Sequence, residues 1–133
     1  MDKKNNDPQG ELVLRTLAMP ADTNPEGDIF GGWLLAQMDI AGGLPAKQLA
    51  AGRVATVAVN SMVFHLPVFV GDVVCCYADI VKVGTTSVTV NVQAWVLRNA
   101  STSNGNEKRE MVTEGSFVYV AVGADRKPRA ISK

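Results

Sequence analysis

The 133-residue chain has few of the residues that cross-link small proteins or build common catalytic sites. It has one histidine, His65, and two cysteines, Cys75 and Cys76, which are adjacent. Neighbours on a strand point to opposite faces, so these thiols would pair only with strain, and their spacing does not suit a metal. We therefore expect two small buried residues, no disulfide framework, and a protein of the reducing cytoplasm.

Excess charge and long apolar runs are also missing. Thirteen basic and thirteen acidic residues cancel, so the charge indicates neither a nucleic-acid nor an acidic-membrane partner. No stretch approaches the roughly 20 consecutive apolar residues of a membrane-spanning helix. The polar start of the chain does not have the pattern of a signal peptide. At 47% hydrophobic residues, the chain can nevertheless bury the core of one compact domain.

Two familiar catalytic patterns do not occur either. There is no G-x-S-x-G sequence, and a single histidine leaves no candidate Ser/His/Asp arrangement. No group of histidine, cysteine and acidic residues has metal-ligand spacing. We expect neither a bound metal nor a cofactor.

The hydrophobic pattern predicts one strand, one long helix and then four strands. The first strand is expected at Glu11–Met19, and the helix at about Phe30–Ala51, weakened or kinked in its middle by Gly42, Gly43 and Pro45. The later strands are expected within 53–72, where Pro67 interrupts, and at 73–84, 85–99 and 111–122, with a polar loop at 100–110. In the strand at 85–99, alternate apolar residues from Val88 to Val96 share one face.

This order of elements predicts an α+β fold. The helix is apolar nearly all round, which indicates that it is enclosed, and one helix cannot cover both faces of a sheet. A curved antiparallel β-sheet wrapped around one long central helix, the hotdog fold, satisfies both facts. We place this single domain at residues 11–123, between a flexible N-terminal segment, 1–10, and a loosely held C-terminal tail, 124–133. One such unit leaves a sheet edge and a helix flank uncovered, so we expect at least a dimer.

One carboxylate, Asp39, interrupts the apolar helical stretch "GGWLLAQMDIAGGLPAK". An unpaired ionised carboxylate buried there costs several kcal/mol, and proteins tolerate that cost at sites that use the group. Two plainer explanations stay open. Asp39 could reach solvent at the rim of the helix, or it could pair with a basic residue such as Arg53.

The residues before the helix and at its start could supply the hydrogen-bond donors that a reaction at Asp39 would need. Gly31 and Gly32 stand at the helix start, where free N–H groups and the positive end of the helix dipole can hold an oxyanion. A tight turn is the simpler explanation of a Gly-Gly pair. Asn24, in the preceding loop, can supply an amide to orient water or substrate. Asp39 lies roughly 10 Å further along the helix, so we expect the helix start of one subunit to face Asp39 of another.

Four blocks of the sequence carry a resemblance to a known family. They are "MPADTNPEGDIFGGWLLAQMDIAGG", "GRVATVAV", "VGDVVCCYADIVKVGTTSV" and "VYVAV". From about residue 10 to residue 128, the chain resembles the YciA-type acyl-CoA thioesterases, a bacterial hotdog family. The resemblance implies hydrolysis of acyl-coenzyme A to a free acid and the CoA thiol, by trimers of hotdog dimers that need no metal and accept a range of acyl chains.

The resemblance also implies roles for individual residues. Asp39 would be the general base or the nucleophile, and Asn24 would act from across the dimer interface. The backbone N–H groups at Gly31 and Gly32 would hold the thioester oxygen. CoA contacts would fall on Arg53, Lys82, Gly84, Thr85, Thr86 and Ser87. The simpler explanation of Arg53, Lys82 and also Arg98 is that they are solvated surface charges and not phosphate ligands.

The chain departs from the family at three positions. Pro45 stands in the helix where relatives usually have a helix former. Asn60 replaces a glutamate, and Leu66 replaces a basic residue, which would weaken or shift a CoA contact that His65 could partly replace. These departures leave the role of Asp39 untouched and put the CoA site in doubt.

Two other functions fit the same fold. A hydratase or dehydratase acting on acyl thioesters would place its histidine before the central helix, whereas His65 follows the second strand. A non-catalytic acyl-CoA-binding protein would have Asp39 paired with a cation and screened from any cleft.

Overall fold

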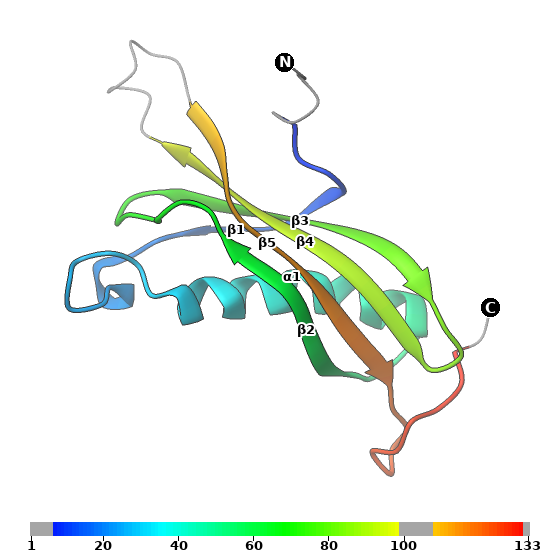
Figure 1. Ribbon diagram of the computed structural model, residues 1–133. Helices are drawn as coiled ribbons and strands as arrows, with labels where there is room; N and C mark the ends of the chain where they lie inside the picture. The colour runs from blue at the N-terminus through cyan, green and yellow to red at the C-terminus, as the bar shows by residue number, and fades with distance from the viewer. Residues whose placement is uncertain (1–6, 99–107, 132–133) are drawn as a thin grey trace.

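A computed structural model describes residues 7–98 and 108–131 of the chain. Its order of elements is β1 (Glu11–Leu17), α1 (Gly31–Ala50), β2 (Val54–Phe64), β3 (Val73–Val83), β4 (Ser87–Arg98) and β5 (Lys108–Ala121), with a short 3₁₀ turn at Pro20–Asp22. Figure 1 shows α1 running along one face of a curved sheet. The predicted α+β hotdog fold is therefore confirmed.

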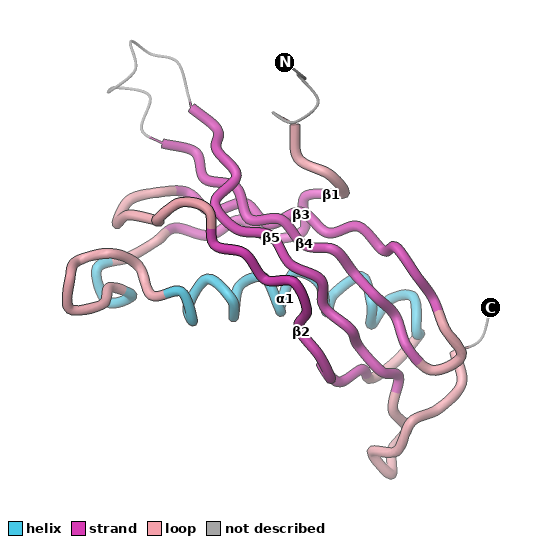
Figure 2. The backbone as a smooth tube through the Cα atoms, viewed as in Figure 1, coloured by secondary structure: helices cyan, strands magenta, loops and turns pink. Residues whose placement is uncertain are grey.

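The five strands form one antiparallel sheet in the order β1-β3-β4-β5-β2. The two strands that flank α1 in the chain, β1 and β2, thus lie at opposite edges of the sheet. The helix between them packs against all five strands, as the layered view in Figure 2 illustrates. This topology leaves one side of β2 without a strand partner in the described part of the chain.

The core lies between α1 and the sheet. The predicted apolar face of β4 is confirmed, because all its members are fully buried: Val88, Val90, Val92, Ala94 and Val96. Phe117 and Tyr119 of β5 and Leu34 and Met38 of α1 complete the centre of this core. Burial of each large apolar side chain contributes about 1.5–3 kcal/mol, so this layer holds the helix against the sheet.

The helix is continuous from Gly31 to Ala50, and Pro45 does not end it. It stops where Ala51 adopts a left-handed conformation with φ of 55° and donates its N–H to the Gln48 carbonyl. Arg129 Nη2 donates to the carbonyl oxygen of Ala50 at 2.8 Å, which satisfies one of the free carbonyls at the helix end.

Three local expectations differ from the structure. Residues 65–72 form a loop, because β2 ends at Phe64, before the proline. Residues 108–110 belong to β5, although they were expected in the polar loop. The rest of that expected loop, 100–107, lies outside the described part. The segment 124–131, expected to be loosely held, is attached to the domain: Ile131 is buried and its N–H donates to the Thr85 carbonyl.

Cys75 and Cys76 are both free and buried on β3, as expected. Burial raises the pKa of the Cys76 thiol to about 12, with a smaller contribution from Cys75. None of the helices in residues 7–98 and 108–131 is long and apolar enough to cross a membrane.

Candidate active site

A hollow of about 350 Å³ lies at the start of α1. Two loops meet here, the one before the helix and the one after β2, and the Ile29 N–H donates to the Val68 carbonyl between them at 3.0 Å. The residues that line the hollow are Asn24, Asp28, Ile29, Phe30, Gly31, Leu34, Phe64, His65, Leu66, Pro67 and Val68. The structure thus brings the predicted Asn24 and Gly31 to one cavity.

Free backbone donors mark this end of the helix. Phe30 occupies the N-cap and supplies no side-chain hydrogen bond, and the first turn contains no acidic residue. The first helical hydrogen bond is from the Leu34 N–H to the Phe30 carbonyl, so the N–H groups of Gly31, Gly32 and Trp33 have no acceptor within the described residues. Free N–H groups and the positive helix dipole together make this a site for a carbonyl oxygen that develops negative charge.

The Asn24 side chain is hydrogen-bonded to its own loop through one of its two polar atoms. Its Oδ1 accepts the N–H groups of Glu26 and Asp28, both at 3.0 Å. This bonding orients the amide group and leaves its Nδ2 donor without a partner in the part of the chain described. The side chain can therefore donate a hydrogen bond into the hollow that it lines.

Asp39 lies in the middle of α1, half-buried against the sheet. Its Oδ1 accepts a hydrogen bond from Thr56 Oγ1 of β2 at 2.8 Å, and Tyr119 Oη of β5 lies 3.0 Å from the same oxygen. Across residues 7–98 and 108–131, Oδ2 has no hydrogen-bond partner and Asp39 forms no ion pair. The alternative in which Asp39 pairs with Arg53 is therefore not observed. One oxygen is anchored by hydrogen bonds, and the other, which we call open, accepts none from the described residues.

Sequence reasoning missed Thr56 and Tyr119. The two residues are register partners on neighbouring strands, so their side chains point to the same face of the sheet, towards α1. A tyrosine on the buried face of the last strand needs a hydrogen-bond partner, and this was the one signal in the sequence that could have identified it. Burial, the charge of Asp39 and the hydrogen bond to it all raise the pKa of Tyr119 well above its ordinary value, so the phenol stays a donor.

The structure does not bring Asp39 to the hollow at the start of its own helix. Eight residues, more than two helical turns, separate it from Gly31, and Asp39 does not line that hollow. Gly32 is exposed beside Gly31 and does not line it either. Within one chain, the carboxylate and the free N–H groups therefore lie apart and do not form one site.

The residues predicted to bind CoA gather at the opposite end of the sheet. The Ala121 N–H donates to the Thr86 carbonyl and the Val122 N–H donates to the Arg53 carbonyl, so β5 joins Arg53 to the turn at 84–87. That turn is closed by a hydrogen bond from the Gly84 N–H to the Ser87 carbonyl at 2.8 Å. Lys82 is exposed just before it.

Two other arginines, Arg126 and Arg98, lie in different surroundings. Arg126, which sequence reasoning missed, lines a hollow of about 300 Å³ together with Arg53. Arg98 forms ion pairs with Asp72 at 3.2 Å and with Glu110 at 2.7 Å, and donates to the Pro67 carbonyl. Arg98 therefore stabilises the loop after β2, which explains its position without a phosphate.

His65 lies in that same loop, with its Nε2 2.8 Å from Glu114 Oε2. Both side chains are exposed, so the pair contributes little to stability. His65 lines the hollow at the helix start and is remote in sequence from the centre of α1. Its position fits a loop residue at the rim of a binding site.

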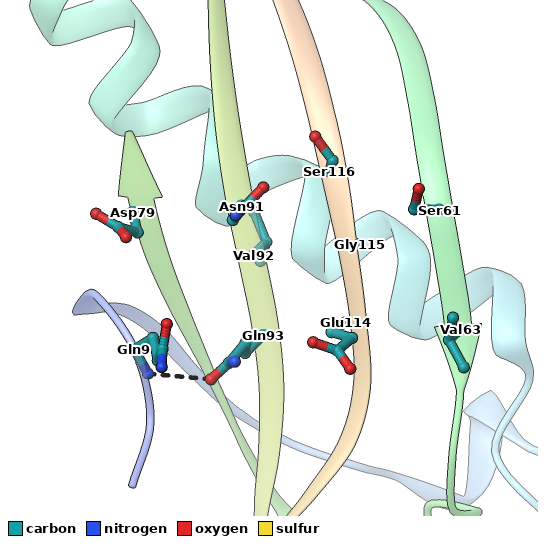
Figure 3. Close-up of a pocket in the computed structure, with 10 residues that line it drawn as sticks. All are labelled: Gln9, Ser61, Val63, Asp79, Asn91, Val92, Gln93, Glu114, Gly115 and Ser116. Atoms are coloured by element: carbon teal, nitrogen blue, oxygen red, sulfur yellow. Dashed lines mark hydrogen bonds between the residues drawn. The ribbon is translucent and has the colours of Figure 1, made fainter. Parts of the chain in front are cut away.

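A third hollow, of about 450 Å³, lies on the face of the sheet turned away from α1. Figure 3 shows the polar side chains that face it, from β3, β4 and β5, including Asp79, Asn91 and Glu114. The Gln9 N–H donates to Gln93 Oε1 at its border. None of the site residues predicted from the sequence lines this hollow. In the described part of the chain, no group of three histidine, cysteine or acidic residues could hold a metal ion.

The curved sheet wrapped around one helix, with a carboxylate at the helix centre, defines a protein of the hotdog class. The model of the thioesterase superfamily matches residues 26–101. The acyl-CoA thioester hydrolase YciA of Salmonella typhimurium is 60% identical over 131 residues, which are 98% of this chain and 97% of that protein. The chain belongs to the thioesterase superfamily and, within it, to the YciA-type acyl-CoA thioesterases.

Solved structures agree with this placement. A hexameric thioesterase from Yersinia pestis matches with a TM-score of 0.86 at 56% identity, over 95% of this chain and 98% of that one. An acyl-CoA hydrolase from Staphylococcus aureus, solved in complex with butyryl-CoA and CoA, matches with a TM-score of 0.78 at 27% identity, over 89% of this chain and 69% of that one. The structures of the staphylococcal enzyme include alanine variants of one asparagine, one aspartate and one threonine.

Proposed function

We propose that the chain hydrolyses the thioester bond of acyl-coenzyme A to a carboxylic acid and the CoA thiol, with Asp39 as the reacting carboxylate. One observation carries the proposal: Asp39 is half-buried without a cation, anchored through Oδ1 and open at Oδ2. The named activities of the Salmonella and Staphylococcus relatives support the choice of substrate.

In the general-base route, Oδ2 of Asp39 takes a proton from water while the water oxygen adds to the thioester carbonyl carbon. The carbonyl oxygen becomes an oxyanion, which the N–H groups at Gly31 and Gly32 stabilise. Collapse of this intermediate breaks the carbon–sulfur bond, and the CoA thiolate takes the proton back from Asp39. Each donor of this kind contributes about 10²–10³-fold and general-base catalysis about 10²–10⁴-fold.

In the nucleophilic route, Asp39 attacks the thioester carbonyl carbon, the carbon–sulfur bond breaks and the CoA thiolate leaves, which forms a mixed anhydride. Water then hydrolyses the anhydride to the carboxylic acid and the Asp39 carboxylate, and the proton released protonates the thiolate. A single turnover in ¹⁸O-labelled water detects the anhydride wherever water attacks its Asp39 carbonyl carbon. Label in the Asp39 side chain, detected by mass spectrometry of the peptide, requires the anhydride. We expect the activity by either route to survive a metal chelator, because neither route uses a metal or a cofactor.

The staphylococcal variants support the assignment of three residues. Their asparagine, aspartate and threonine are separated by 15 and 17 residues in that enzyme. Asn24, Asp39 and Thr56 have the same two separations in this chain. We infer that Thr56 holds Oδ1 of Asp39 in the reactive orientation and that Asn24 Nδ2 orients the water or the thioester.

We further propose that the Asp39 carboxylate of one chain and the helix-start N–H groups with Asn24 of its partner are two half-sites. They are joined across a dimer formed through the free side of β2. This edge and the adjacent flank of α1 expose large apolar side chains: Ile40, Leu44, Val57, Val59, Val63 and Phe64. An apolar surface beside an unpaired strand edge favours association with a second copy. The hexameric Yersinia relative supports self-association, and a trimer of such dimers is the hexamer that we expect.

A complementation experiment tests the shared site. Asp39→Ala and Asn24→Ala chains are each expected to be inactive as pure assemblies. If Asp39 of one chain works with Asn24 of its partner, a mixed dimer has one intact site and one doubly damaged site. Random mixing by co-refolding would then restore about a quarter of the wild-type activity, because about half of the dimers are mixed. No recovery from demonstrably mixed dimers would contradict the shared site.

The CoA part of the substrate is proposed to contact Arg53, Lys82 and the turn Gly84–Ser87. Arg53 and the turn lie at one end of the sheet, and the two basic side chains can pair with phosphate groups. Arg53→Gln should raise KM for acyl-CoA while kcat changes little. It should leave unchanged the KM for an acyl thioester that lacks the nucleotide.

The function itself is tested with a panel of acyl-CoAs and a thiol-reactive dye. We expect thiol release by the wild type, a loss of about 10²–10⁴-fold in Asp39→Ala, and retention in His65→Ala. Loss in both variants, with water added across a double bond, would favour a hydratase. Binding without turnover by the wild type would favour a non-catalytic acyl-CoA-binding protein.

A further inference from the structure

We propose that Tyr119 is a positioning residue for Asp39. The Tyr119 phenol O–H ties the Asp39 carboxylate to the backbone of α1, in the space left by Gly42 and Gly43. The inference rests on the proposed role of Asp39 in thioester hydrolysis. It adds a residue of β5, 80 positions away in the sequence, to the groups that determine the rate.

The hydrogen bonds define what the phenol does. Tyr119 Oη lies 2.9 Å from the backbone carbonyl oxygen of Asp39 and 3.0 Å from Oδ1 of the same residue. Because a phenol has one proton, the two acceptors share it. The hydroxyl thus links the side chain and the main chain of Asp39 and limits rotation of the carboxylate. With Thr56 Oγ1 on the same oxygen, Oδ2 remains the atom that can accept a proton.

The Tyr119 ring has little freedom to move away. The residue is 1% exposed, and its ring stacks on Phe117 with centroids 6.3 Å apart and an interplanar angle of 13°. On its other side lies the helix. A Cβ added at Gly42 would stand 2.5 Å from Tyr119 Oη, and one added at Gly43 would stand 3.5 Å from the ring. The glycine at 42 therefore creates the space in which the hydroxyl reaches Asp39.

A purely structural tyrosine would also be buried and hydrogen-bonded, so the experiment has to separate the two roles. A structural role predicts lower stability with the same catalytic constants in the fraction that folds. A positioning role predicts a fall in kcat at nearly constant KM, because the carboxylate acts in the chemical step. It also predicts that the effect disappears once the carboxylate is gone.

The test compares Tyr119→Phe with Tyr77→Phe, the same substitution at a half-buried tyrosine of β3 away from Asp39. We expect kcat for acyl-CoA hydrolysis to fall about tenfold in Tyr119→Phe, the size of one lost orienting hydrogen bond, with KM within about twofold. Tyr77→Phe should match the wild type. In the Asp39→Ala background, Tyr119→Phe should leave the residual rate unchanged.

Two results would overturn the inference. One is a wild-type kcat in folded Tyr119→Phe, and the other is an equal loss with and without Asp39. If Tyr119→Phe does not fold, Gly42→Ala serves in its place, since it keeps the ring and displaces the hydroxyl; a wild-type kcat there also overturns the inference. Failure of the proposed function looks different, because Asp39→Ala would then hydrolyse acyl-CoA as fast as the wild type.

Discussion

Adjacent glycines in α1 should respond in opposite directions to the same substitution. Gly42 and Gly43 both lie in the helix interior, where alanine is favoured over glycine by about 1 kcal/mol. They differ in the space beside them. At Gly42 an added Cβ would lie 2.5 Å from Tyr119 Oη and 3.1 Å from Val92 Cγ2, whereas at Gly43 its nearest contact is an ordinary 3.5 Å.

The expected free energies follow from these distances. Overpacking of a buried site costs about 1–3 kcal/mol, and a displaced hydrogen bond costs about 0.5–1.5 kcal/mol. After the gain in helix propensity, Gly42→Ala should destabilise the protein by about 0.5–3.5 kcal/mol. Gly43→Ala should be neutral or stabilising by up to about 1 kcal/mol.

The assay is urea-induced unfolding of both variants and the wild type at one subunit concentration, because association shifts the apparent stability. The double variant Gly42→Ala/Tyr119→Phe provides the internal check. Without the phenol oxygen, the added methyl loses its closest contact, so the cost of Gly42→Ala should shrink in that background. Equal destabilisation by the two glycine variants, or an undiminished cost in the double variant, would refute this account of the helix.

Two further outcomes are expected. Asn24→Asp retains an acceptor for the Glu26 and Asp28 N–H groups but loses the Nδ2 donor. We expect kcat to fall at least about tenfold while the unfolding midpoint stays close to that of the wild type. A fully active Asn24→Asp would contradict the donor role. Burial raises the pKa of Cys76 from 9.0 to about 12 in the folded chain. As the pH rises from 9, the thiol therefore ionises in the unfolded chain before it ionises in the folded one. The contribution of Cys76 to stability is complete below pH 9 and is lost as the pH rises towards 12. Urea unfolding over this pH range should show a smaller decline in Cys76→Ala than in the wild type, and an equal decline would contradict the burial of the thiol.

Much of the architecture could be predicted from local pattern. Alternation from Val88 to Val96 identified a strand with one buried face, and the long apolar run identified the helix. Such periodicity survives folding because each element has to present its apolar side to the same core. The isolated charge of Asp39 could be noticed for the same reason, since it breaks the pattern of its own helix.

The partners of Asp39 could not be predicted in this way. Thr56 and Tyr119 come from two strands that meet only through the register of β2 on β5, and no local pattern encodes that register. The same is true of Arg126, which joins Arg53 at one hollow, and of Arg129, which caps α1 from the end of the chain.

The sequence by itself determined which segments are helix and strand, and that one carboxylate interrupts an apolar helix, because both follow from the order of neighbouring residues. Only the tertiary structure decided which oxygen of that carboxylate is anchored and which is open. That choice depends on hydroxyl groups 17 and 80 residues away, which reach Asp39 because the sheet curves around the helix.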